Sequence, residues 1–233
     1  MRSKFQAPWA NIADMMSGLM MIFLFISLVY SFETSKITEQ LREKQDVVEA
    51  IAVSYTDNRS QIYESLNNHF SAEFSSWDAT LDKDSLTVRF NDPELLFEPG
   101  SSRLTARFKT ILAQFWSDYI EILGEYSDDI REIKIEGHTS SEWSDASLED
   151  AYFNNMRLSQ QRTRETLKFC YQITPNDSRA WTRSTVTANG MSSSRPILDD
   201  AGNEDTVSSR RVEFTVVVDS TSRLNKILGE LND

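Results

Sequence analysis

The 233-residue chain is poor in residues that break helices or form crosslinks, with one cysteine, five prolines and seven glycines. The single cysteine, Cys170, excludes an internal disulfide. Residues 33–74 contain neither glycine nor proline, so nothing in their composition breaks a helix there. Basic residues are also in deficit. The formal net charge of −12 argues against nucleic acid and anionic membrane surfaces as partners.

Signals of catalysis are equally scarce. The sequence has no pairing of a nucleophile with a base and no glycine-rich phosphate loop. Its two histidines, His69 and His138, are isolated, and His138 has no Cys, His or acidic neighbours at metal-ligand spacing. We therefore predict that the protein is not an enzyme and that it holds no metal or cofactor.

One long apolar run contrasts with this polar composition. Apart from Asp14, residues 9–32 carry no charge, and 15–32 would span about 27 Å as a helix at ~1.5 Å per residue. The alternative, a secretory signal, is disfavoured because the run is too long and lacks an A-x-A cleavage site. We predict a transmembrane helix at 12–32 after a short tail at 1–11. A carboxylate at mid-bilayer costs roughly 2.5–3.5 kcal/mol, so Asp14 requires a functional reason.

The segment 33–74 has the pattern of a charged helical connector with one apolar stripe. Apolar residues, Leu41 and Ile51 among them, recur at spacings of three, four or seven between positions 37 and 66. The polar stretch 54–60 weakens the pattern and allows a break. An exposed helix with such a stripe needs a partner. A parallel dimer and a helix folded back on its own domain are both open.

From residue 75 to 219 the spacing of apolar residues predicts an α+β domain. The expected elements are a hairpin over 77–90, a helix from the N-cap Thr105 to Gly124, a strand at 130–137, a helix at 154–173, and strands at 182–190 and 210–219. This β-α-β-α-β-β order predicts a mixed sheet with helices on one side. We expect a solvated loop at 199–209 and a C-terminal tail at 220–233.

Five blocks of this domain resemble the OmpA-like peptidoglycan-binding domain. They are LLFEPGSSRLT, IKIEGHTS, NMRLSQQRTRETLKF, NGMSSSRPI and RRVEFTV, in the family's order and spacing over about residues 80–218. The resemblance implies a pocket for the diaminopimelate of the peptidoglycan stem peptide. A guanidinium would bind the carboxylate of that ligand and an acid would bind its ammonium group.

The resemblance also implies which residues bind peptidoglycan. The family's arginine falls on Arg162, and Asn155 and Leu158 precede it at spacings of three and four, hence on one helix face. Thr139, in the GHT segment, is expected to contact the ligand or to orient the turn. We therefore predict a peptidoglycan-binding set of Thr139, Asn155, Leu158 and Arg162.

The aspartate of the family does not transfer, because its position holds Ser140 here. The chain also carries extra residues, SEWSDASLEDAYFN, between Ser140 and the predicted helix. Asp145, Glu149 or Asp150 could supply the missing acid from this insertion, and the sequence leaves the choice open. We expect His138 to be a packing or hydrogen-bonded turn residue rather than a ligand.

The apolar run resembles the membrane helix of stator B subunits of the MotB family. The shared pattern is A-D-x-M-S-G-x-M at 13–20. Asp14, Ser17, Gly18 and Met21 fall on one helix face, and small residues on that face allow neighbouring helices to approach closely. The resemblance implies that Asp14 carries the translocated H⁺ or Na⁺, with Ser17 as a possible hydrogen-bond partner of the carboxylate.

The resemblance further implies partners and a location. An OmpA-like domain needs cell wall to bind, which predicts a single-pass protein of the bacterial inner membrane with a cytoplasmic N-terminus and a periplasmic C-terminal domain. Two B chains would form a dimer inside a ring of five A-type (MotA/ZorA-like) membrane subunits. The short tail and the insertion look more like a Zorya anti-phage defence stator than a flagellar or gliding one. A passive wall tether is the third possibility, but a tether would have no use for Asp14.

Overall fold

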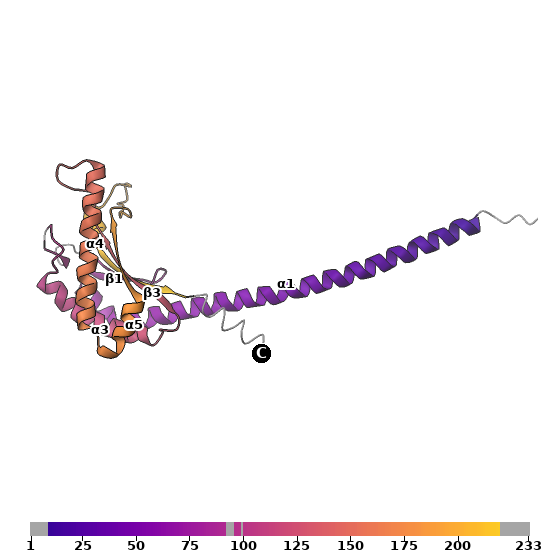
Figure 1. The fold of residues 1–233 in the computed structure, drawn as a ribbon, viewed down its shortest axis with the longest axis horizontal. Coiled ribbons are helices and arrows are strands. Elements are labelled where there is room, and N and C mark those ends of the chain that lie inside the picture. Colours follow the sequence, from indigo (N-terminus) through magenta and orange to yellow (C-terminus); the bar gives the residue numbers. More distant parts are fainter. Residues whose placement is uncertain (1–8, 92–95, 99, 220–233) are drawn as a thin grey trace, which may run out of the picture. The chain divides into compact units, whose positions relative to one another are not determined.

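The computed structural model describes residues 9–91, 96–98 and 100–219, and the chain divides into two compact units, 1–52 and 53–233. Residues 1–8 of the predicted N-terminal tail and the whole predicted C-terminal tail at 220–233 lie outside the described residues. Figure 1 identifies the helices and strands by their labels.

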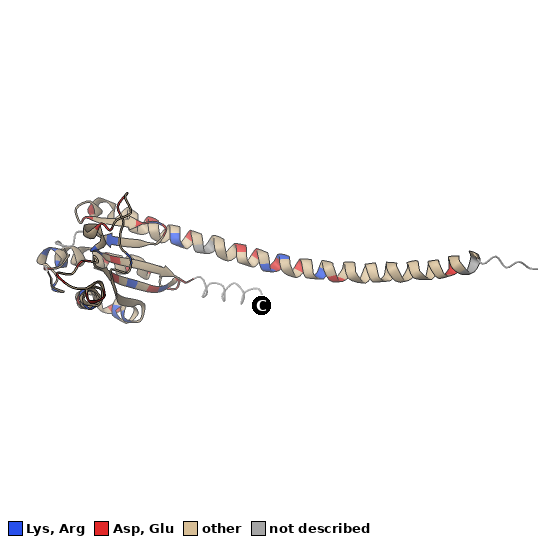
Figure 2. Cartoon of the chain, turned by 90° about the horizontal axis from the view of Figure 1, so that it is seen from above, with Lys and Arg blue, Asp and Glu red and all other residues tan. Residues whose placement is uncertain are grey.

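Helix α1 (Trp9–Phe74) contains both the predicted span and the predicted connector. It continues through 54–60 without the break that we allowed, because weak helix formers in that stretch lower propensity without blocking the backbone. Within the described residues it is the one helix apolar enough to cross a membrane, with a window of mean hydropathy 2.1 and no part of that window buried. Figure 2 shows the charged residues gathering along the middle of α1, beyond this apolar stretch.

The last turns of α1 belong to the core of the C-terminal unit. Ile62, Leu66 and Phe70 are at most 1% exposed, and their spacing of four places them on one helix face. The unit therefore begins at Val53 rather than at residue 75, where we expected the domain to start. The two ends of the apolar stripe differ in burial: Leu41, near its start, is exposed, whereas Ile62 and Leu66, at its end, are buried. The end of the expected connector thus folds onto its own domain.

The C-terminal unit is built on one mixed sheet of five strands in the order β1-β2-β5-β3-β4. The strands are β1 (Ala79–Asp82), β2 (Thr87–Phe90), β3 (Ile130–His138), β4 (Val186–Ser192) and β5 (Val212–Val218). Strands β3 and β4 are parallel, and the other neighbours are antiparallel. The Asp82 carboxylate accepts the Ser85 N–H at 2.7 Å and so closes the hairpin turn where we predicted it.

Helices α3 (Ala106–Gly124) and α4 (Leu148–Ile173) pack on the apolar face of this sheet. The Thr105 hydroxyl caps α3 as predicted, accepting the Phe108 N–H at 3.0 Å. Phe214 of β5 lies 5.2 Å from the ring of Phe115 on α3, measured between ring centroids. Helix α4 lies alongside the strands (Figure 1). The α+β class and the placement of these helices on one face are confirmed.

Two glycines let α4 approach the sheet closely. A Cβ built on Gly137 would lie 2.7 Å from a methyl carbon of Thr163. A Cβ on Gly190 would lie 2.4 Å from the backbone nitrogen of Gln160, which cannot move independently of the helix. The pairing of β3 with β4 under α4 therefore depends on the missing side chain at Gly190.

The start of α4 differs from the sequence prediction. The helix begins at Leu148 rather than at 154, so part of the predicted insertion is helical. Ser147 caps it, because its hydroxyl accepts the Asp150 N–H at 3.1 Å. The acidic residues of the first turn also suit a helix N-terminus electrostatically. We had assigned this stretch to a loop because the family lacks it.

The strand predicted at 182–190 is wrong over its first residues. Residues 179–185 form helix α5 (Arg179–Thr185), and β4 starts only at Val186. Thr182 and Thr185 are β-branched and favour strands by propensity, but both are buried in the helix, where packing outweighs propensity. Within the described residues the chain has two further short helices, η1 (Asn176–Ser178) and, inside the loop predicted at 199–209, α6 (Thr206–Ser209).

Candidate functional site

All four residues predicted for peptidoglycan binding line one cavity of about 380 Å³. They are Thr139, Asn155, Leu158 and Arg162, and the cavity is completed by Gly100, Ser140, Glu142, Trp143, Ser144 and Arg210. The walls come from α4, from the loop between β3 and α4, from the segment before α3 and from the residue pair before β5. The volume suits a small ligand, since such sites usually measure roughly 300–1,000 Å³.

Arg162 is held in place by two contacts on the side of the cavity. Its Nε donates to the Ser101 carbonyl at 3.0 Å, and its guanidinium carbon lies 4.8 Å from the centroid of the Phe97 ring. Burial and the nearby charge of Arg210 lower the pKa of Arg162 to about 10, so the group is still protonated at neutral pH. An anion in the cavity would offset both unfavourable effects.

The segment that holds Arg162 is a short irregular hairpin before α3. Phe97 and Leu104 form an isolated antiparallel bridge, and the Glu98 N–H donates to the Arg103 carbonyl at 3.1 Å. Gly100 lies at the tip with a φ of 65°, a backbone conformation that glycine adopts at no steric cost. This is the first of the five sequence blocks, and its role is to position the arginine of the third.

The loop 139–147 is tied down from two directions. The Ser141 N–H donates to Glu204 Oε1 at 3.0 Å, and the Ser141 hydroxyl contacts the other oxygen of the same carboxylate. The Asn155 amide donates to the Glu142 carbonyl at 3.2 Å. Asn155 is 3% exposed, so its main contact is with the loop that forms the cavity wall. It therefore positions Glu142 as well as lining the cavity.

Thr139 is buried, with 3% of its surface exposed, and its N–H donates to the Ser192 carbonyl at 3.0 Å. Among the described residues its hydroxyl has no hydrogen-bond partner. A buried hydroxyl rarely remains without one, so a ligand or a water in the cavity is the available partner. That Thr139 contacts the ligand or orients the turn stays a prediction.

The acid that lines the cavity is none of the three candidates from the insertion. Asp145, Glu149 and Asp150 do not line it, and the Asp150 carboxylate instead accepts the Ser147 hydroxyl at 2.7 Å. Glu142 occupies the wall, with its Oε2 3.9 Å from Nη1 of Arg210 and 66% of its side chain exposed. The cavity therefore combines two guanidinium groups with one carboxylate.

Sequence reasoning missed both Glu142 and Arg210. The signal for Arg210 is the pair of arginines before β5, because consecutive side chains near a strand point to opposite faces of the sheet. Arg211 is buried on the other face, where its Nε donates to Glu213 at 2.7 Å. Its neighbour Arg210 therefore points to the face with the cavity, which it lines. Glu142 lies two residues after Ser140, on the same turn as the family's missing aspartate.

His138 lies at the end of β3 and is buried, but it does not line the cavity described above. Its Nε2 is 3.3 Å from Oε2 of Glu213, whose other oxygen accepts from Arg211 and from Arg89. Burial raises the pKa of Glu213, but the hydrogen bonds and charges of His138 and Arg211 lower it by more, to well below its ordinary value. His138 therefore packs at the end of β3 beside the buried Arg211–Glu213 pair.

The residues predicted to carry the ion lie on α1 in the N-terminal unit. Asp14 and Ser17 are both exposed and are three residues apart, on one helix face. The Ser17 hydroxyl donates to the Ala13 carbonyl at 2.8 Å. Its proton is thus directed to the helix backbone and not to the Asp14 carboxylate, in contrast to the hydrogen bond that we considered.

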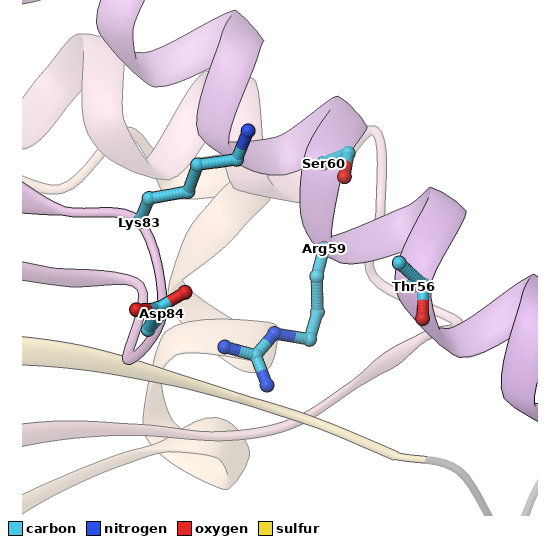
Figure 3. A pocket seen from close by; sticks show the side chains of 5 residues that line it. All are labelled: Thr56, Arg59, Ser60, Lys83 and Asp84. Atoms are coloured by element: carbon cyan, nitrogen blue, oxygen red, sulfur yellow. The ribbon is translucent and has the colours of Figure 1, made fainter.

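A second hollow, of about 300 Å³, lies within the C-terminal unit beside the turn between β1 and β2. In Figure 3 the side chains of Arg59 and Lys83 extend toward each other's element, and Asp84 lies on the turn below. Lys83 Nζ is 5.5 Å from the centroid of the Tyr63 ring. No predicted site residue lines this hollow. Within the described ranges, no group of three His, Cys, Asp or Glu side chains is placed to hold a metal ion.

An apolar N-terminal helix is followed here by an α+β domain whose fold is known from a solved MotB-like protein. The fold matches that of a MotB-like protein from Desulfovibrio vulgaris with a TM-score of 0.52, over 71% of this chain and 94% of that one, at 20% identity. The chain is also 41% identical over 224 residues to the Zorya protein ZorB of Escherichia coli (Crooks strain), which covers 95% of this chain and 92% of the relative. It belongs to the ZorB family. No family model matches the sequence.

Proposed function

We propose that the chain is the peptidoglycan-anchored B subunit of an ion-driven rotary stator in the inner membrane, working in a Zorya-type anti-phage defence system. The observation that carries the proposal is the presence on one chain of a charged cavity in the folded unit and a lone carboxylate, Asp14, in an apolar helix. The 41% identity to a Zorya protein favours defence over flagellar or gliding motility.

The cavity supplies the groups that the diaminopimelate of peptidoglycan requires. Arg162 and Arg210 bind carboxylate, for which the planar guanidinium is well suited. Glu142, which lines the cavity beside Arg210, binds the ammonium group, and the unpartnered hydroxyl of Thr139 gives a further hydrogen bond. The side chain of diaminopimelate carries both an ammonium and a carboxylate group, so it is complementary to this arrangement. A neutral sugar alone would leave the charged side chains of the cavity unpaired.

The apolar helix supplies the motor. A carboxylate in an apolar helix binds a cation in one environment and releases it in another, so Asp14 takes up and releases a cation as its surroundings change. Two copies of the chain sit inside a ring of five A-type subunits, and H⁺ or Na⁺ passage through Asp14 drives movement of that ring. Wall binding by the C-terminal unit places it in the periplasm and the N-terminus in the cytoplasm.

The decisive experiment replaces Asp14 with asparagine in cells that carry the complete system. The amide keeps the size of the side chain but cannot carry a proton or pair with a cation. We expect Asp14→Asn to abolish protection against phage at an unchanged protein level, and Asp14→Glu to retain a fraction of it. Ser17→Ala should be milder, because the Ser17 proton is bound to the backbone at Ala13. Full protection by the asparagine variant would mean that the protein is a passive tether.

A further inference from the structure

Trp143 is an aromatic side chain on an otherwise polar loop. It is partly exposed and lines the same cavity as Arg162 and Glu142. Most other aromatic rings of the C-terminal unit pack in the core, where the Trp116 indole N–H donates to Thr174 at 2.8 Å. Within the described part of the chain, Trp143 has neither a ring partner nor a hydrogen bond to its indole nitrogen.

We propose that Trp143 forms a subsite for an N-acetylated sugar ring of the glycan strand, next to the part of the cavity that binds the peptide. The inference rests on the proposed function and adds the sugar to its ligand. One face of a pyranose ring presents C–H groups and stacks on an aromatic face, while its hydroxyl and acetyl groups accept hydrogen bonds at the edge. An indole offers both an apolar face and a single N–H donor.

The backbone on both sides of Trp143 is fixed. The Glu142 carbonyl accepts the Asn155 amide at 3.2 Å, and the Trp143 carbonyl accepts the Ala146 N–H at 3.3 Å. Holding the loop before the ligand arrives reduces the entropy that binding would otherwise cost. The backbone that carries the indole is therefore held in place where the indole lines the cavity.

The position of Trp143 also fits the covalent structure of the ligand. In peptidoglycan, two residues of the stem peptide and a lactyl ether separate the diaminopimelate from the sugar, a flexible link on the order of 10 Å. A ligand bound through Arg162 and Glu142 thus keeps its sugar within reach of the cavity wall. Glu142 and Trp143 are adjacent in the chain, so the charged and the aromatic subsites are contiguous.

The test compares two soluble ligands on the full chain in detergent, by calorimetry. One is the stem tetrapeptide with diaminopimelate, and the other is the same peptide attached to its disaccharide. We expect the wild type to bind the disaccharide form about tenfold more tightly, which corresponds to ~1.4 kcal/mol from one stacked ring. Trp143→Ala should remove this difference, so that the two ligands bind with equal affinity. Trp143→Tyr should retain most of it.

Phe153→Ala is the matched control, because this α4 aromatic is 62% exposed and does not line the cavity. It should change neither affinity. Equal wild-type affinity for the two ligands would overturn the sugar subsite, and so would an equal loss of both ligands in Trp143→Ala. If the wild type binds neither ligand, the proposed wall binding itself fails. If it binds the bare peptide and Arg162→Ala abolishes that binding, the proposed peptidoglycan binding stands whatever happens at Trp143.

Discussion

Replacing Arg162 with alanine tests the peptidoglycan site most directly. The change removes one of the two guanidinium groups from the cavity and leaves Arg210 in place. A hydrogen bond to a charged group contributes about 1.5–3 kcal/mol, and every ~1.4 kcal/mol is a factor of ten in affinity. We therefore expect Arg162→Ala to weaken binding to isolated peptidoglycan by roughly 10- to 150-fold.

The effect on stability should be smaller but not zero. Arg162→Ala loses the hydrogen bond to Ser101 and the contact with the Phe97 ring, the second of which is worth about 0.5–1 kcal/mol. It also relieves the burial of a charge and its repulsion by Arg210, the two effects that lower the pKa of Arg162. We expect a net loss of about 1 kcal/mol, which lowers Tm by about 2–4 °C for a unit of this size. Replacing a fully exposed arginine on a helix would change the free energy of unfolding by less than this.

The assay is co-sedimentation of the full chain in detergent with isolated peptidoglycan, with Tm measured on the same samples. Arg157→Ala is the matched control, since Arg157 is exposed on α4 and does not line the cavity. Arg162→Lys keeps the charge but loses the planar fork, so it should bind at an intermediate level. Wild-type sedimentation of Arg162→Ala, or an equal loss in Arg157→Ala, would refute the assignment of Arg162 to the ligand.

Three further outcomes are expected. A cysteine at Leu41 should cross-link two copies more efficiently than one at Glu43 on non-reducing gels, and equal yields would contradict pairing through the apolar stripe. The free energy of unfolding, from denaturant titrations, should fall as pH drops below about 4.5, the ordinary pKa of Glu213. In that range Glu213 binds a proton in the unfolded chain but not in the folded one. Glu213→Gln should flatten this dependence on pH. Gly190→Ala should lower the free energy of unfolding by about 2 kcal/mol or more, because its Cβ would lie 2.4 Å from a backbone nitrogen of α4. Gly124→Ala should not lower the free energy of unfolding in this way, because a Cβ on Gly124 would have no atom within 4 Å.

Local patterns in the sequence predicted most of the fold. Thr105 is a hydroxyl before an amphipathic stretch, and it caps α3 as such residues usually do. Ile130, Ile133 and Ile135 predicted β3 although only the last two keep the period of a strand, and the register shift between Ile130 and Glu132 accounts for the extra residue. The prediction was wrong where packing outweighs local preference, at Thr182 and Thr185 in α5. The true start of α4 was missed because Ser147 had been counted as part of an insertion.

The candidate site could be predicted only as far as it lies on one element. Asn155, Leu158 and Arg162 have helical spacing, so any α4 brings them to one face. Glu142 and Arg210 reach the cavity from a loop and from the edge of a distant strand, and only the tertiary fold shows that their side chains come within 3.9 Å of each other. Spacing along the chain carries no information about such a contact.

The anchoring of the loop at Ser141 has a consequence for how such proteins diversify. The carboxylate that holds Ser141 belongs to Glu204, which is outside the cavity, and the Asn155 amide holds the backbone carbonyl of Glu142. The frame of the loop therefore does not depend on the side chains of Glu142 and Trp143. Substitutions at Glu142 and Trp143 can therefore change the ligand-facing side chains while the loop keeps its conformation and the protein stays folded. A lineage that meets a differently modified cell wall can change its recognition surface in a few substitutions while inheriting the rest of the domain intact.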